Sequence, residues 1–158
     1  MRILNYLQEN CIIFPLESSS KKDVIKKLAA KAAFCVNRLS ADDVYKVVMD
    51  REELGTTAIG GRIAIPHAKA EGIESLQVIV AVSKKGVPFD SVDGEPVHVI
   101  FMLLAPEEYT TNYLRVLAKI SRLLKDKEMI DQLIRAESIS HIFSLIEKAE
   151  NRFYGVLV

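Results

Sequence analysis

The chain has 158 residues, of which 49% are hydrophobic and 27% are charged, as is usual for a globular protein. Lysine plus arginine and aspartate plus glutamate both number 21, so the formal net charge of zero gives no support to nucleic-acid binding. No apolar run approaches the ~20 residues of a membrane span, and the N-terminus lacks the apolar core of a signal peptide. We expect one cytoplasmic domain over residues 1–158, with its core at about 3–150 and no direct membrane insertion.

Two cysteines, Cys11 and Cys35, lie in apolar stretches and form neither a CxxC pair nor a metal-ligand spacing. We expect both to be reduced thiols in the core. The chain contains no GxxxxGK[ST] loop for ATP and no set of residues that calls for a metal, so no cofactor and no metal are expected.

The first fifty residues contain a weakly amphipathic start, a short apolar run closed by Pro15 and two segments with helical spacing. These patterns predict a short helix near 1–8, a strand at 11–14, and helices at about 21–36 and 40–51. Serines precede both of the longer helices and can cap their N-termini. One side of the helix at 21–36 would carry five lysines and is interpreted as a solvated face: Lys21, Lys22, Lys26, Lys27 and Lys31.

The next segment, residues 51–69, concentrates polar and glycine residues before a short apolar run that ends in Pro66-His67. Glycines and threonines in this density predict a loop. Because the preceding helix ends near Arg51, that side chain would stand at the mouth of the loop. The strand would stop at about residue 65 and leave His67 at a fixed, partly exposed place.

The second half of the chain contains two nearly continuous apolar runs, which are typical of strands buried on both faces. We expect strands at 76–83 and 97–105, loops at 69–75 and 89–94, and a turn at 84–88. Three helices would follow, at 110 or 111 to about 124, at 127–136, and from Ser138 or Ser140 onward. His98, inside the second of these strands, is interpreted as a packed or edge-facing residue, and His141 as a surface residue. The mixture predicts an α/β single-domain sandwich with a mixed central sheet flanked by helices.

Histidine in the setting of His67 suits covalent phosphoryl chemistry. Its unperturbed pKa of about 6.5 leaves much of the imidazole neutral and nucleophilic near pH 7. The hydroxyls of Thr56 and Thr57, the Arg51 cation and backbone N–H groups of the glycines could face a phosphoryl group. The alternative is a turn that carries a surface histidine without a function.

The run Glu52-x6-Ile59-Gly60-x2-Ile63-Ala64-Ile65-Pro66-His67-Ala68 resembles the phosphorylation-site motif of the fructose/mannitol-type enzyme IIA domain of the sugar phosphotransferase system. The resemblance extends to Arg51-Glu52, to Leu54-Gly55-x-Thr57 and to Phe89-Asp90-x-x-Asp93-Gly94, and so to nearly the whole chain. It implies a mixed sheet flanked by helices. It also implies that His67 accepts a phosphoryl group from the phosphohistidine of HPr or a similar carrier and passes it to a cysteine of a IIB domain. Arg51 would neutralise the phosphoryl oxygens, and Thr57 would add a hydrogen bond.

One position departs from the family pattern. The run from Tyr113 to Ser121 is similar to a family segment that often begins with a second histidine near the acceptor, and here Tyr113 takes that place. A tyrosine hydroxyl donates one hydrogen bond but does not become a cation near pH 7.

Two functions from different classes follow from the resemblance. The first is a phosphocarrier, an enzyme-like transfer component that uses His67. The second is a regulatory binding module of the nitrogen-related branch of the family, whose phosphorylation state gates contacts with target proteins. Discharge of the phosphoryl group to a IIB cysteine would distinguish the two.

Overall fold

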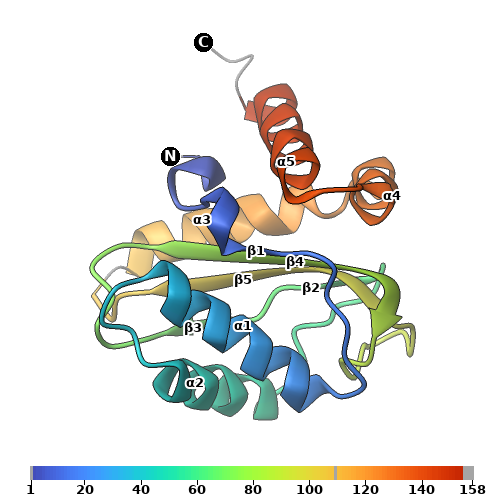
Figure 1. The fold of residues 1–158 in the computed structure, drawn as a ribbon. Coiled ribbons are helices and arrows are strands. Elements are labelled where there is room, and N and C mark those ends of the chain that lie inside the picture. The colour runs from blue at the N-terminus through green and yellow to red at the C-terminus, as the bar shows by residue number, and fades with distance from the viewer. Residues whose placement is uncertain (1, 109, 155–158) are drawn as a thin grey trace.

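The computed structural model describes residues 2–108 and 110–154, and the chain folds around a five-stranded mixed sheet (Figure 1). The strands are β1 (Ile12–Ile13), β2 (Ile63–Ala64), β3 (His67–Lys69), β4 (Gln77–Val87) and β5 (Val97–Ala105). β4 and β5 pair antiparallel in the centre, and β1 adds to β4 in parallel. β2 and β3 both pair in parallel with β5, one after the other along its length.

Helices cover both faces of the sheet. α1 (Lys21–Cys35) and α2 (Ala41–Glu53) lie on one face, while α3 (Thr110–Leu123), α4 (Lys127–Arg135) and α5 (Ile139–Tyr154) lie on the other (Figure 1). Ser20 and Ser40 cap α1 and α2 by accepting hydrogen bonds from the backbone N–H groups of Asp23 and Asp43. The expected α/β sandwich with a mixed sheet flanked by helices is confirmed.

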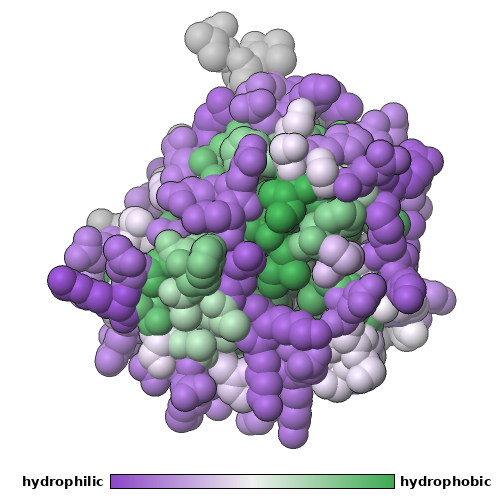
Figure 2. All heavy atoms as spheres, in the orientation of Figure 1, coloured by the Kyte–Doolittle hydropathy of each residue, from purple (hydrophilic) through white to green (hydrophobic). Residues whose placement is uncertain are grey.

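The core explains why β4 and β5 lack the alternation of a one-sided sheet. Residues 78–82 and 99–105 are buried without interruption, because helices pack on both sides of them. Figure 2 shows polar side chains over most of the surface, with apolar side chains visible at the level of the sheet between the two helical layers. No helix in residues 2–108 and 110–154 is long and apolar enough to cross a membrane.

Three element predictions were wrong in part. The expected first helix is only a 3-10 turn, Ile3–Asn5. The predicted turn at 84–88 belongs mostly to β4, which continues to Val87 and pairs with Val97 after an irregularity. The loop expected from residue 69 onward begins one residue later, because Lys69 still belongs to β3. Pro66 interrupts the strand pairing only briefly before residues 67–69 pair with residues 103–105.

The prediction of reduced cysteines was also wrong for this structure, in which Cys11 and Cys35 form a disulfide. Their Cα atoms are 5.8 Å apart, within the usual range for such a bond. The bond joins the 3-10 turn Glu9–Cys11 to the last residue of α1. The two cysteines are 24 residues apart, so only the packing of these two segments brings them together.

Candidate functional site

His67 is the first residue of β3, immediately after the Pro66 break, and its side chain is half-buried. Its Nδ1 atom lies 2.8 Å from the backbone carbonyl oxygen of Ile65. A carbonyl oxygen only accepts hydrogen bonds, so Nδ1 carries the proton in the neutral ring. The lone pair is therefore on Nε2. The hydrogen bond to Ile65 thus sets both the orientation and the tautomer of the imidazole.

The surroundings of His67 favour its neutral form. Burial lowers the pKa of His67 and has the largest effect; the hydrogen bond to Ile65 opposes it, and the Arg51 cation lowers the pKa further. The net pKa lies below the ordinary value of 6.5. His67 is consequently a neutral nucleophile at physiological pH.

This depressed pKa predicts a measurable titration. The unfolded chain binds a proton at His67 as the pH falls through about 6.5, whereas the folded chain does so only at lower pH. His67 therefore reduces folding stability as the pH falls below about 6.5 and has no such effect well above it. We expect the imidazole Hε1 signal in NMR to titrate with a midpoint below 6.5, and to move upward in Arg51→Gln. A midpoint at or above 6.5 in the unmodified protein would contradict the geometry described above.

A cavity of about 500 Å³ opens beside His67, between α2, β3 and α3. It is mostly apolar, with a few polar and charged groups. It is lined by Val47, Asp50, Arg51, Leu54, His67, Ala68, Lys69, Tyr113, Leu114 and Leu117. The structure therefore brings three of the predicted site residues to one cavity: His67, Arg51 and Tyr113.

Arg51 reaches this cavity from the last turn of α2. Its Nη1 atom donates a hydrogen bond of 3.1 Å to the backbone oxygen of Gly55, and the side chain is half-buried. The guanidinium has five N–H donors, so this bond leaves others for an anion. A fixed cation beside a neutral nucleophile is an arrangement that suits an incoming phosphoryl group.

The two predicted threonines do not line the cavity. The Thr57 hydroxyl donates to Glu52, and its backbone N–H donates to the Glu52 Oε2 atom at 3.0 Å. The Thr56 hydroxyl donates to the Phe89 carbonyl oxygen at 3.0 Å and accepts from the Ala58 N–H at 3.1 Å. Both hydroxyls position the loop in this structure, and their contact with a phosphoryl group stays a prediction.

Sequence reasoning did not identify a structural role for Glu52. This carboxylate is buried, binds both donors of Thr57 and lies 2.9 Å from the Lys21 Nζ atom. The assignment of Lys21 to a solvated face was therefore wrong, because α1 begins close enough to α2 for the pair to form. The spacing of Val44, Val48 and Glu52, which are the buried residues of α2, was the available signal.

The loop at 89–94 also contacts the two glycines that precede β2, Gly60 and Gly61. Asp93 accepts a hydrogen bond from the Gly61 N–H at 3.0 Å, and hydrogen bonds from Ser91, Glu95 and Gly61 lower the pKa of this carboxyl. Gly60 has a φ of +98°, and an added Cβ would lie 3.2 Å from the Asp93 Oδ2 atom. The Gly60 position therefore favours glycine for both conformation and space.

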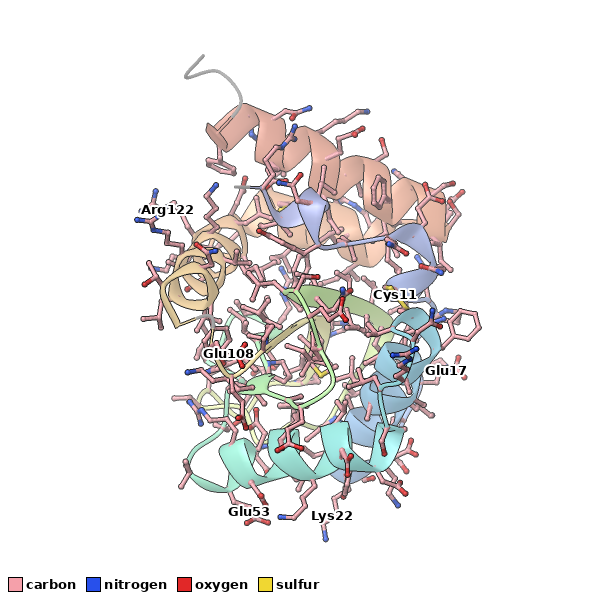
Figure 3. All side chains as sticks on the ribbon, turned by 90° about the vertical axis from the view of Figure 1, so that its left-hand side faces the viewer. Cys11, Glu17, Lys22, Glu53, Glu108 and Arg122 are labelled. Carbon is pink, nitrogen blue, oxygen red and sulfur yellow. A yellow bond between two sulfur atoms is a disulfide. The ribbon has the colours of Figure 1, made fainter. Side chains whose placement is uncertain are left out.

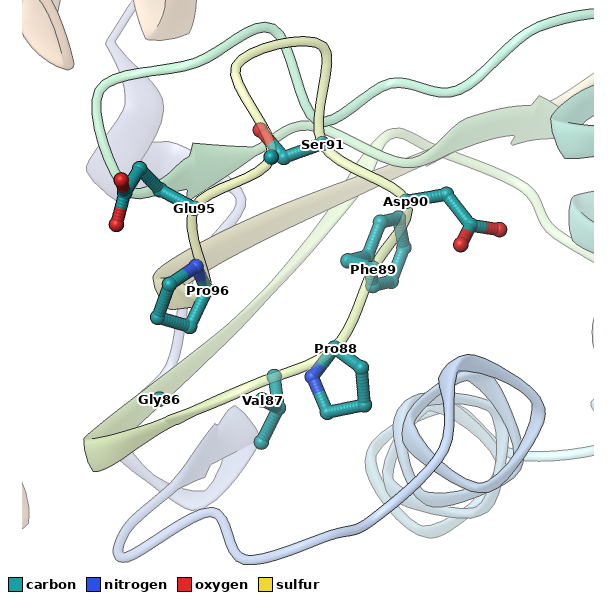
Figure 4. Close-up of a pocket in the computed structure, with 9 residues that line it drawn as sticks. Gly86, Val87, Pro88, Phe89, Asp90, Ser91, Glu95 and Pro96 are labelled. Atoms are coloured by element: carbon teal, nitrogen blue, oxygen red, sulfur yellow. The ribbon is translucent and has the colours of Figure 1, made fainter.

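A second hollow, of about 530 Å³, lies at the far end of β4 (Figure 4). It is lined by Gly86, Val87, Pro88, Phe89, Asp90, Ser91, Gly94, Glu95 and Pro96. Its charged side chains are the carboxylates of Asp90 and Glu95, which would repel a phosphoryl group. The cavity of His67, whose lining includes the cations Arg51 and Lys69 as well as Asp50, suits an anion better than this hollow does.

Comparisons with known proteins show what the chain as a whole is similar to. The family described as "Phosphoenolpyruvate-dependent sugar phosphotransferase system, EIIA 2" matches residues 5–149. A nitrogen regulatory protein of Bradyrhizobium diazoefficiens is 36% identical over 146 residues, which cover 92% of this chain and 95% of that protein. The fructose-specific EIIABC component of Bacillus subtilis is 34% identical over 149 residues, covering 94% of this chain but only 23% of that protein. The crystal structure of the nitrogen regulatory protein IIA-Ntr from Neisseria meningitidis aligns with a TM-score of 0.83 and 30% identity, covering 90% of this chain and 97% of that one.

Proposed function

We propose that this chain, which belongs to the EIIA 2 family of the phosphoenolpyruvate-dependent sugar phosphotransferase system, carries a phosphoryl group on Nε2 of His67. The observation that supports this most directly is the hydrogen bond from Nδ1 to the Ile65 carbonyl oxygen. It leaves the Nε2 lone pair as the nucleophile in a cavity that also contains the Arg51 guanidinium.

The transfer step conserves atoms and charge. The Nε2 lone pair of His67 attacks the phosphorus atom of a donor phosphohistidine, and the donor N–P bond breaks as the new one forms. The bonding pair returns to the donor ring. The proton on Nδ1 of His67 stays in its bond to Ile65, so the phosphorylated ring is an imidazolium and no proton has to move. Positioning and charge stabilisation then supply the catalysis.

Arg51 would stabilise the charge on the equatorial oxygens during transfer. We expect Arg51→Gln to slow phosphorylation of His67 by about 100-fold or more, as removal of a charge-stabilising donor does in other enzymes. The Arg51→Lys variant keeps the charge but loses the planar set of N–H donors. Its phosphorylation rate should therefore lie between the rates of the wild type and of Arg51→Gln. The measurement is the initial rate of phosphate incorporation from a phosphorylated carrier. Arg122→Gln, which changes an exposed arginine on α3 (Figure 3), is the matched control and should keep the full rate. Equal rates for Arg51→Gln and the control would refute this role.

We further propose that the donor is an HPr-like carrier and the acceptor a cysteine of a IIB domain. The rim of the cavity supports docking of proteins, because Leu54 is 84% exposed and Leu114 is 56% exposed on either side of it. Exposed apolar side chains of this size beside a reactive group are typical of a protein interface. The cytoplasm remains the expected location for such a chain.

A regulatory role is the second candidate. The relatives named as nitrogen regulatory proteins favour it, at 36% and 30% identity. A phosphoryl group on His67 would add nearly two negative charges between Leu54 and Leu114. That change is sufficient to weaken an apolar contact with a target protein or to create a new charged one.

Phosphoryl transfer from a phosphorylated HPr-like protein tests the proposal. We expect acid-labile label on the wild-type chain, and peptide mapping should locate it on His67. Adding candidate IIB domains then distinguishes the two functions: discharge to a IIB cysteine supports the transport component, and retention of the label supports the regulatory module. Absence of label from every carrier tried would refute the phosphocarrier.

A further inference from the structure

Tyr113, in the first turns of α3, is a buried tyrosine, and its hydroxyl has no hydrogen-bond partner among the side chains and backbone that the structure describes in residues 2–108 and 110–154. Its side chain is one of the residues that line the cavity of His67, yet only 8% of the residue is exposed. Burying a hydroxyl without a partner costs free energy, so such groups are rare unless they serve a ligand. Because Tyr113 lies beside His67, the ligand that its hydroxyl could contact is a group bound to that histidine.

Three neighbours define the surroundings of Tyr113. The ring centroids of Tyr113 and His67 are 6.0 Å apart, with a tilt of 57°. The Lys69 Nζ atom lies 5.9 Å from the centroid of the Tyr113 ring. Arg51 is close enough that its cation lowers the pKa of both Tyr113 and His67. An oxyanion bound between Arg51 and the His67 Nε2 atom would therefore lie beside the tyrosine.

We propose that the Tyr113 hydroxyl is a catalytic hydrogen-bond donor, which binds an oxygen of the phosphoryl group as it is transferred to Nε2 of His67. This inference rests on the proposed function. It assigns to Tyr113, which lines the cavity, a direct contact with the reacting group.

The hydroxyl keeps its proton over the whole physiological range. Burial raises the pKa of Tyr113 to about 12, although Arg51 acts in the opposite direction. The other charged or titratable groups that line the cavity are Asp50, Arg51, His67 and Lys69. Of these, His67 is the one whose ordinary pKa lies near neutrality. Tyr113 therefore supplies a donor whose strength does not change with pH between about 6 and 9.

Phosphoramidate is the probe that tests this contact without a protein partner. The Nε2 lone pair attacks its phosphorus, and the N–P bond breaks with loss of ammonia, which takes the bonding pair. We expect Tyr113→Phe to slow this phosphorylation by about 10- to 100-fold, as loss of one hydrogen bond to a charged group does. We also expect its phosphohistidine signal in ³¹P NMR to shift, because one oxygen has lost its donor.

Thermal unfolding separates catalysis from structure. The phenol oxygen has no partner to lose within the described part of the chain, so Tyr113→Phe should leave Tm unchanged or raise it. Tyr45→Phe is the matched control: this tyrosine lies on α2, with Lys26 over its ring at 5.8 Å, and should be phosphorylated at the wild-type rate. An unchanged rate in Tyr113→Phe, or a rate that falls together with Tm, would overturn the inference and leave the role of His67 intact. If neither phosphoramidate nor any phosphorylated carrier protein labels His67 in the wild type, both proposals fail.

Discussion

Replacing His67 with glutamine is expected to abolish phosphorylation by any phosphorylated carrier protein. Glutamine can keep a polar group near the Ile65 carbonyl, but its amide nitrogen has no nucleophilic lone pair. The chain contains two other histidines, and neither lines the cavity that contains Arg51. The residual rate should therefore fall below detection, and not merely decrease by the 100-fold expected for Arg51→Gln.

The other two histidines lie in different surroundings, one packed against the backbone and one on the surface. The Nδ1 atom of His98 lies 2.9 Å from the Ser83 carbonyl oxygen, and its Nε2 atom packs against Gly86, where an added Cβ would lie only 3.0 Å away. His141 is exposed on α5, and its Nδ1 atom accepts a hydrogen bond from the Glu137 N–H at 3.4 Å. His98→Gln and His141→Gln are therefore matched controls that should keep the label. Label on His67→Gln, or its loss in His141→Gln, would contradict the assignment.

The elements that the sequence predicts most accurately are those with local signals. β5 is predicted with both ends correct, because its apolar run lies between Pro96 and Pro106 and neither proline can continue the ladder. The starts of α1 and α2 follow from their serine caps. The ends of β4 are predicted less well, since Lys84 and Lys85 resemble turn residues although Val87 still pairs with β5.

The parts of the site that depend on tertiary contacts could not be predicted in the same way. The pairing of β3 with β5 joins His67 to Leu103, and no pattern in either segment specifies that register. The ion pair of Lys21 with Glu52 forms only once α1 and α2 pack together. The disulfide of Cys11 depends on similar long-range packing. For Thr56 and Thr57, the motif predicts contact with a phosphoryl group. Their hydroxyls instead bind Phe89 and Glu52, which lie far from them in the sequence or in another element.

The Glu52 carboxylate supports the loop between α2 and β2, and its removal should cost much of the folding stability. In Glu52→Ala, the Thr57 N–H and hydroxyl lose their acceptors, and the Lys21 ammonium, whose side chain is 15% exposed, loses its counter-charge. Breaking a buried, hydrogen-bonded ion pair by removing one partner costs about 3 to 5 kcal/mol. We expect the free energy of unfolding in urea to fall by roughly 3 kcal/mol. That is a large part of the stability of a typical domain.

The next residue of α2 is a matched control for this experiment. Glu53 has the same side chain on the same turn of the helix, but it extends into solvent (Figure 3). Glu53→Ala should change the free energy of unfolding by no more than about 0.5 kcal/mol. The Glu52→Gln variant keeps one oxygen that can accept from the Thr57 N–H. Its free energy of unfolding should therefore lie between those of Glu52→Ala and Glu53→Ala. If Glu52→Ala and Glu53→Ala unfold at the same urea concentration, the network of Glu52, Thr57 and Lys21 does not stabilise the fold. The position of Arg51 would then have to come from α2 alone.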